Sequence, residues 1–170
     1  MNIGIIDIAG LIGMASFVLA YQAKSVRGTN MWFIPGDFSY CAHFFLLGAP
    51  GLAAMTCVAG IRDILMTSTK RRLLRYTAYF YPPLIWLLTW LTAEQSYEFL
   101  GCIASTLCVI GMSLQGRFLT SRLVLLAHQF VWVAGAICTG SWPLLLHNAL
   151  TISSSITTML RYRRAVVQAA

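Results

Sequence analysis

Lysine and arginine recur after every second apolar segment of this chain of 170 residues. Basic groups follow the first, third, fifth and seventh segments: Lys24 and Arg27; Lys70, Arg71, Arg72 and Arg75; Arg117 and Arg122; Arg161, Arg163 and Arg164. The intervening connections carry neither residue type, and Glu94 and Glu98 lie around the middle one. Because short basic loops resist translocation, this alternation predicts seven transmembrane helices, with the N-terminus outside and the C-terminus in the cytoplasm.

The composition supports an integral membrane protein. Apolar residues make up 58% of the chain and charged residues only 10%, whereas a soluble domain carries about 25% charged residues. The net charge of +7 indicates topology and attraction to anionic cytoplasmic lipid. A nucleic-acid partner is not expected, because no basic face with interleaved aromatic residues lies outside the apolar segments. The first segment has no basic stretch before it, unlike a signal peptide, so we expect it to remain as a helix.

The predicted fold is all-α, a single transmembrane domain over residues 1–170. A spanning helix needs about 20 apolar residues, and the expected spans are 4–22, 30–48, 51–68, 73–92, 97–115, 119–138 and 142–160. The fourth span contains Pro82 and Pro83, which remove two backbone donors and predict a kink.

The chain also repeats itself weakly at an offset of 92 residues. Gly48 then aligns with Gly140, Tyr40 with Trp132, and Asp37 with Gln129. The order, polarity and lengths of the segments agree. This predicts two parallel three-helix units, 4–72 and 97–164, joined by an inverting helix at 73–92, an arrangement found in one class of small transporters.

This 3+1+3 plan resembles the SWEET and PQ-loop superfamily, and the stretch from Tyr21 to Thr29 is similar to its Pro-Gln signature, with Tyr21 in place of the proline. A closer resemblance is to the bacterial YgjV inner-membrane protein family. It rests on three motifs, Gln22-Ala23-Lys24-Ser25, His43-Phe44-Phe45-Leu46-Leu47-Gly48 and Ile61-Arg62-Asp63. The resemblance implies the fold and the membrane, but no established substrate.

Ionisable residues inside the spans are costly, so each is a candidate site residue. Asp37 and Arg62 are expected roughly 10 Å and roughly 12 Å above the cytoplasmic face, at 1.5 Å per helical residue. Their shared depth and opposite charge predict an ion pair inside the bundle. The alternative is that Arg62 extends to the cytoplasmic interface while Asp37 is hydrated or protonated.

In the second unit the positions aligned with this pair are uncharged, Gln129 for Asp37 and Ser154 for Arg62. His147, Thr151 and Ser154 share one helical face, with Asn148 beside them. If the two units surround a path, the candidate binding residues are Asp37, Arg62, Gln129, His147, Asn148, Thr151 and Ser154. Hydrogen bonding between helices is the competing explanation.

Other chemistry finds little support in the sequence. The five cysteines fall inside apolar segments without ligand spacing, and no motif of paired carboxylates, nucleophile elbow or phosphate loop is visible. We therefore expect no metal, no cofactor and no enzyme activity.

Two functions are compatible with these residues. The first is a transporter of a small polar solute, with its path between the units. The second is a membrane receptor or assembly subunit that binds a peptide, lipid or partner protein without transport. Membrane lipids are expected partners in both, and both allow a homo-oligomer.

Overall fold

The computed structural model describes residues 4–22, 26–68, 71–114 and 117–169. These residues form seven α-helices and one short 3₁₀ helix, without a strand among them. The helices are α1 (Ile5–Gln22), α2 (Val26–Leu46), α3 (Pro50–Ser68), α4 (Arg71–Thr92), η1 (Ser96–Glu98), α5 (Phe99–Ser113), α6 (Phe118–Thr139) and α7 (Trp142–Ala169).

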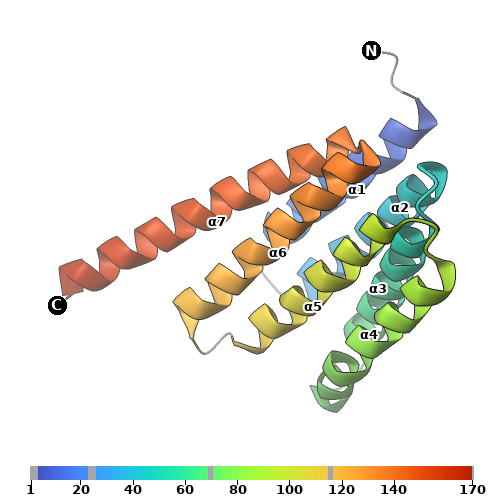
Figure 1. Cartoon of the computed structure of the whole chain (residues 1–170). Helices are drawn as coiled ribbons and strands as arrows, with labels where there is room; N and C mark the ends of the chain where they lie inside the picture. Colours follow the sequence, from blue (N-terminus) through green and yellow to red (C-terminus); the bar gives the residue numbers. More distant parts are fainter. Residues whose placement is uncertain (1–3, 23–25, 69–70, 115–116, 170) are drawn as a thin grey trace.

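Each apolar segment expected from the sequence corresponds to one of these helices. The all-α class is thus confirmed, while Lys24, Lys70 and Gln115 lie outside the described residues. The largest difference is at the C-terminus, where α7 continues to Ala169 and projects beyond the other helices (Figure 1). Helix α4 continues through Pro82 and Pro83.

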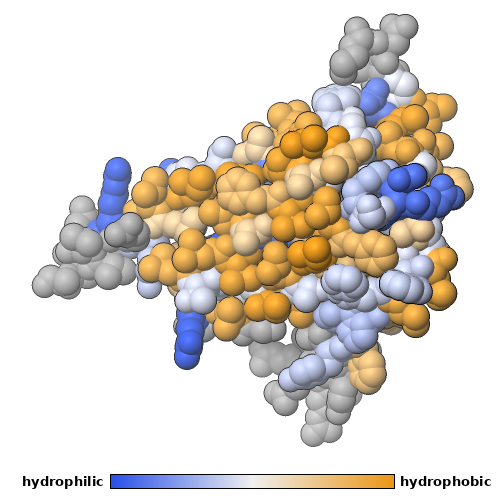
Figure 2. Space-filling model, viewed as in Figure 1, coloured by the Kyte–Doolittle hydropathy of each residue, from blue (hydrophilic) through white to orange (hydrophobic). Residues whose placement is uncertain are grey.

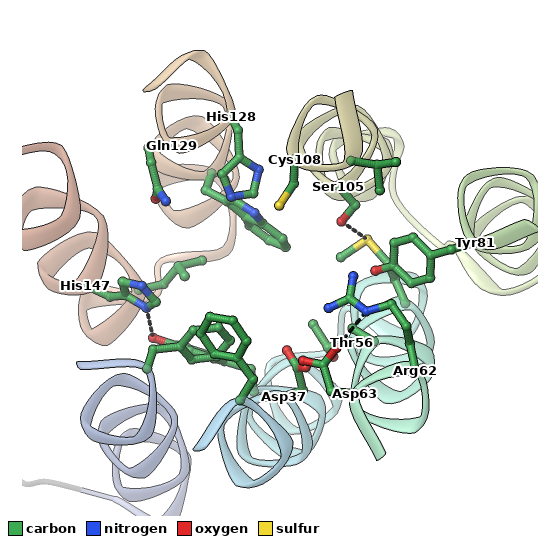
Figure 3. A pocket seen from close by; sticks show the side chains of 18 of the residues that line it. Asp37, Thr56, Arg62, Asp63, Tyr81, Ser105, Cys108, His128, Gln129 and His147 are labelled. Atoms are coloured by element: carbon green, nitrogen blue, oxygen red, sulfur yellow. Dashed lines mark hydrogen bonds and ion pairs between the residues drawn. The ribbon is translucent and has the colours of Figure 1, made fainter. Parts of the chain in front are cut away.

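Helices α1–α3 and α5–α7 form a ring around a central space, and α4 lies outside it (Figure 3). Consecutive helices pack against each other throughout the chain. The ring is closed by two further contacts, α3 with α5 and α1 with α7. If α1–α3 and α5–α7 are taken as two groups, each of these contacts joins the first helix of one group to the last helix of the other.

The turns that precede α3 and α7 have the same backbone geometry. Gly48 and Gly140 both adopt a left-handed conformation, with φ of 73° and 66°. The next residue donates its N–H back across the turn, from Ala49 to the Phe44 carbonyl and from Ser141 to the Ala136 carbonyl, at 2.9 Å in both cases. This pattern satisfies the last carbonyls of the preceding helix.

Polar side chains anchor the first turns of α3 and α7. The buried Glu98 carboxylate accepts the N–H groups of Gly51 at 2.6 Å and Leu52 at 3.2 Å, and also those of Glu94 and Gln95. At the start of α7, Ser141 Oγ accepts the Leu144 N–H and bonds to His43 Nε2.

The outer surface is apolar. Large hydrophobic side chains are exposed on all seven helices, for example Ile12, Trp32, Ile64, Leu87, Ile110, Phe130 and Leu150. Figure 2 shows this apolar surface along the helices on the face in view. By length and composition, Phe118–Thr139 alone among the described residues qualifies as a membrane span, and Ile5–Ala20 and Ser96–Met112 are shorter apolar helices. Exposed apolar surface of this extent suits contact with lipid.

Candidate functional site

A cavity of about 470 Å³ lies in the centre of the ring, and all seven helices contribute to its wall. The residues that line it are Phe17, Asn30, Phe33, Asp37, Tyr40, Phe44, Met55, Thr56, Ala59, Arg62, Asp63, Tyr81, Ser105, Cys108, Val109, Met112, His128, Gln129, Trp132, Leu144, His147 and Asn148. Five of the seven predicted site residues are in this set: Asp37, Arg62, Gln129, His147 and Asn148. The wall combines charged groups on one side with neutral polar groups on the other (Figure 3).

Arg62 is held on the charged side by two contacts. Its Nε donates to Asp63 Oδ1 at 2.7 Å, and its guanidinium carbon lies 4.7 Å from the centre of the Tyr81 ring. The prediction of a direct Asp37–Arg62 ion pair was therefore wrong, because the neighbouring residue on α3 supplies the carboxylate. The alternative, that Arg62 extends to the cytoplasmic interface while Asp37 is hydrated or protonated, stays a prediction, and Arg62 lines the cavity.

Asp37 and Asp63 place two carboxylates next to each other (Figure 3). Asp37 is 7% exposed and Asp63 is 2% exposed. The Oδ2 atom of each has no hydrogen-bond partner within the described part of the chain. Buried carboxylate oxygens normally have partners, so these two atoms are available to a ligand.

The opposite wall holds neutral groups from α6 and α7. A hydrogen bond of 3.1 Å joins His147 Nδ1 on α7 to the Tyr40 hydroxyl on α2. Asn148 donates to the Leu144 carbonyl at 2.8 Å, and the buried Gln129 lines the cavity beside them. These groups offer hydrogen bonds without net charge.

Thr151 and Ser154 were also expected to line the path, but neither is among the cavity-lining residues. The Thr151 hydroxyl donates to the His147 carbonyl within α7, and Ser154 is exposed. The helical face that carries His147, Thr151 and Ser154 therefore lines the cavity at His147 but not farther toward the C-terminal end of α7.

Aromatic rings flank the charged side. Phe33 and Tyr40 come from the same helix as Asp37, four residues before it and three after it, which places all three on one face. Phe17 packs against both rings, with centroid distances of 5.1 Å to Phe33 and 5.7 Å to Tyr40. The carboxylate of Asp37 thus lies beside an apolar aromatic surface.

The cavity lining also includes residues that were not chosen as site residues from the sequence, among them Asp63, Tyr81 and His128. Asp63 was visible as a second carboxylate in the Ile61-Arg62-Asp63 motif but was not chosen as a site residue. Tyr81 reaches the cavity from α4, the helix outside the ring. His128 also lines it and donates from Nδ1 to the Ala104 carbonyl at 2.7 Å.

Comparison with known proteins gives one match. The model of a family described as Imp-YgjV, bacterial inner membrane protein, matches residues 4–166, which is almost the whole chain. The match confirms the resemblance drawn from the three short motifs. No curated protein and no solved structure matched the chain.

Proposed function

The chain belongs to the Imp-YgjV family of bacterial inner membrane proteins, and from this premise we propose that it transports a small polar solute across that membrane. The path would run through the central cavity, between the unit of α1–α3 and the unit of α5–α7. The observation that carries the proposal is a cavity lined by charged and polar groups inside a bundle whose outer surface is apolar.

The proposed topology places all seven helices across the membrane, with the N-terminus outside. It is supported by the basic residues that follow α1, α3 and α5 in the sequence and by those in the C-terminal part of α7. The connections before α3, α5 and α7 then face the outside, and they contain the two glycine turns and Glu98.

A parallel repeat of the SWEET kind is the second part of the proposal. The two glycine turns lie 92 positions apart and have matching hydrogen bonds. The two contacts that close the ring are equivalent under the same repeat. Several cavity-lining residues also pair at this offset: Phe17 with Val109, Asp37 with Gln129, Tyr40 with Trp132, Met55 with His147, and Thr56 with Asn148. Corresponding positions of the two units therefore face one space, as expected for a path between repeats.

Native Cys108 offers a direct test, because it lines the cavity. Cys57, half-buried on α3 and not among the lining residues, is the matched control. Two variants would each keep one of these cysteines and replace the other four. A small charged thiol reagent would be added to membrane vesicles of each orientation, and the labelling rate measured.

For a transporter we expect Cys108 to react from both sides of the membrane and Cys57 to react much more slowly. Reaction of Cys108 from one side only would favour a receptor that binds its ligand without transport. Protection from both sides would indicate a dry bundle and an assembly subunit, and would overturn the proposed path.

A further inference from the structure

The charges that line the cavity do not balance. Asp37, Arg62 and Asp63 are the charged residues among its lining, so two carboxylates share one guanidinium. Arg62 is directly paired with Asp63, and Asp37 has no ion-pair partner among the described residues. An unpaired buried charge is costly. Either a proton shared between the two carboxylates or a cation in the cavity would compensate for it, and a binding experiment distinguishes the two.

The same two carboxylates also have hydrogen-bond acceptors without matching donors. Asp37 Oδ2 and Asp63 Oδ2 are both buried and both lack a hydrogen-bond donor within the described residues, and Figure 3 shows the two carboxylates side by side. A primary ammonium has three N–H donors on one compact centre. It could therefore bind both oxygens at once, whereas a quaternary ammonium has no N–H to donate.

The surroundings suit an organic cation better than a metal ion. The described residues contain no group of three or more His, Cys, Asp or Glu side chains that could hold a metal. The cavity wall also includes the rings of Phe33 and Tyr40, which share a face of α2 with Asp37, and the ring of Phe17, which packs against both. Aromatic faces attract ammonium groups and accommodate an alkyl chain.

We propose that the cavity binds a small primary amine, with its ammonium group between Asp37 and Asp63 and its body extending along the aromatic rings toward Gln129 and His147. This inference rests on the proposed function, because it names the substrate class of the same cavity. The cavity of about 470 Å³ is at the lower end of the volumes usual for ligand pockets, roughly 300–1,000 Å³, which fits a short aliphatic amine.

Binding by the purified full-length protein in detergent tests the proposal. The probes are 4-amino-1-butanol, the diol 1,4-butanediol, and the N,N,N-trimethyl derivative of the amine. The diol keeps the size but lacks the charge, and the trimethyl derivative keeps the charge but lacks the N–H donors. Affinity would be measured by calorimetry, and thermal unfolding would be followed with each probe and with sodium chloride.

We expect the amine to bind and the diol not to bind, with the trimethyl derivative weaker by about 10- to 100-fold, since hydrogen bonds to charged groups are lost. Asp37→Asn should weaken amine binding by a similar factor. Glu94→Gln, which removes an exposed carboxylate outside the cavity, should leave it unchanged. Without ligand, Asp37→Asn should unfold at the same temperature as the wild type or higher, because an unpaired charge has been removed.

Equal binding of amine and diol, or full binding by Asp37→Asn, would overturn the proposal. Stabilisation by sodium alone would assign the site to an inorganic cation instead. If Asp37→Asn does not fold, the three probes on the wild-type protein still decide the question. Failure of every amine while Cys108 remains accessible from both sides would reject the amine and leave the proposed path in place.

Discussion

The two walls of the cavity come from helices with the same order and equivalent turns, yet their chemistry is opposite. The wall from α2 and α3 carries Asp37, Arg62 and Asp63. At the positions 92 residues later, α6 and α7 carry Gln129, Ser154 and Ser155. The backbone geometry of the turns is thus shared between the halves, while all the charge lies on one side.

This difference makes the charge distribution in the cavity asymmetric. A ligand with a positive group at one end and a neutral polar group at the other can bind in one orientation only. The second unit has His147 at the position that corresponds to Met55, and Asn148 at the position that corresponds to Thr56, and all four residues line the cavity. The two halves are therefore complementary rather than redundant.

The largest effect that tests this asymmetry is expected from Arg62→Gln. Without the guanidinium, Asp63 and Asp37 become two unpaired carboxylates in the same cavity, and loss of one partner of a buried pair costs about 3–5 kcal/mol. Ser154→Ala, the corresponding change in the second half, should alter the free energy of unfolding by less than about 0.5 kcal/mol. Reversible unfolding in mixed detergent micelles measures both.

The double variant Arg62→Gln/Asp63→Asn provides the control for that experiment. It removes the charge and its direct partner together, so it should lose less stability than the sum of the two single variants, by about 0.5–3 kcal/mol. Strict additivity would mean that the 2.7 Å contact between these side chains contributes nothing to folding.

The helices could be predicted well from the sequence, because the length of an apolar segment and the basic residues beside it are local properties of the chain. The candidate site was predicted less completely, since helical periodicity does not say how far a face extends along the cavity. His147 lines the cavity, but Thr151 on the same face does not. Depth along two helices likewise suggested Asp37 as the partner of Arg62, whereas side-chain orientation made Asp63 the partner.

Glu98 illustrates the same limit. In the sequence it was one of two acidic residues near an exterior connection, but in the structure it is fully buried and binds four backbone N–H groups. Two of these bonds are local, from Glu94 and Gln95 in the capping box at η1. The other two require the packing of η1 against the start of α3, which no local pattern in either segment encodes.

A smaller loss of stability is expected when the side chains that anchor the starts of α3 and α7, Glu98 and Ser141, are changed. Glu98→Gln keeps the shape but replaces one accepting oxygen by a donor that faces N–H groups, so we expect a loss of about 1.5–3 kcal/mol. Ser141→Ala removes the anchor of α7 and should cost about 0.5–2 kcal/mol. Hydrogen exchange should show faster exchange at Gly51 and Leu52 in the first variant, and at Leu144 in the second. Equal and small effects would show that these contacts do not fix the helix starts.

The last comparison concerns the feature that the halves share, the two glycine turns. Gly48→Ala and Gly140→Ala place a side chain on a left-handed residue, which costs roughly 1–2 kcal/mol for L-amino acids. An added Cβ would meet no other atom within 4 Å at either position, so the cost comes from the backbone conformation alone. Because the φ angles and turn hydrogen bonds match, the two variants should lose the same free energy of unfolding. Asparagine at each position should lose less, since it tolerates this conformation better. Unequal losses would show that the two turns differ in the folded protein and would weaken the argument that the halves are repeats.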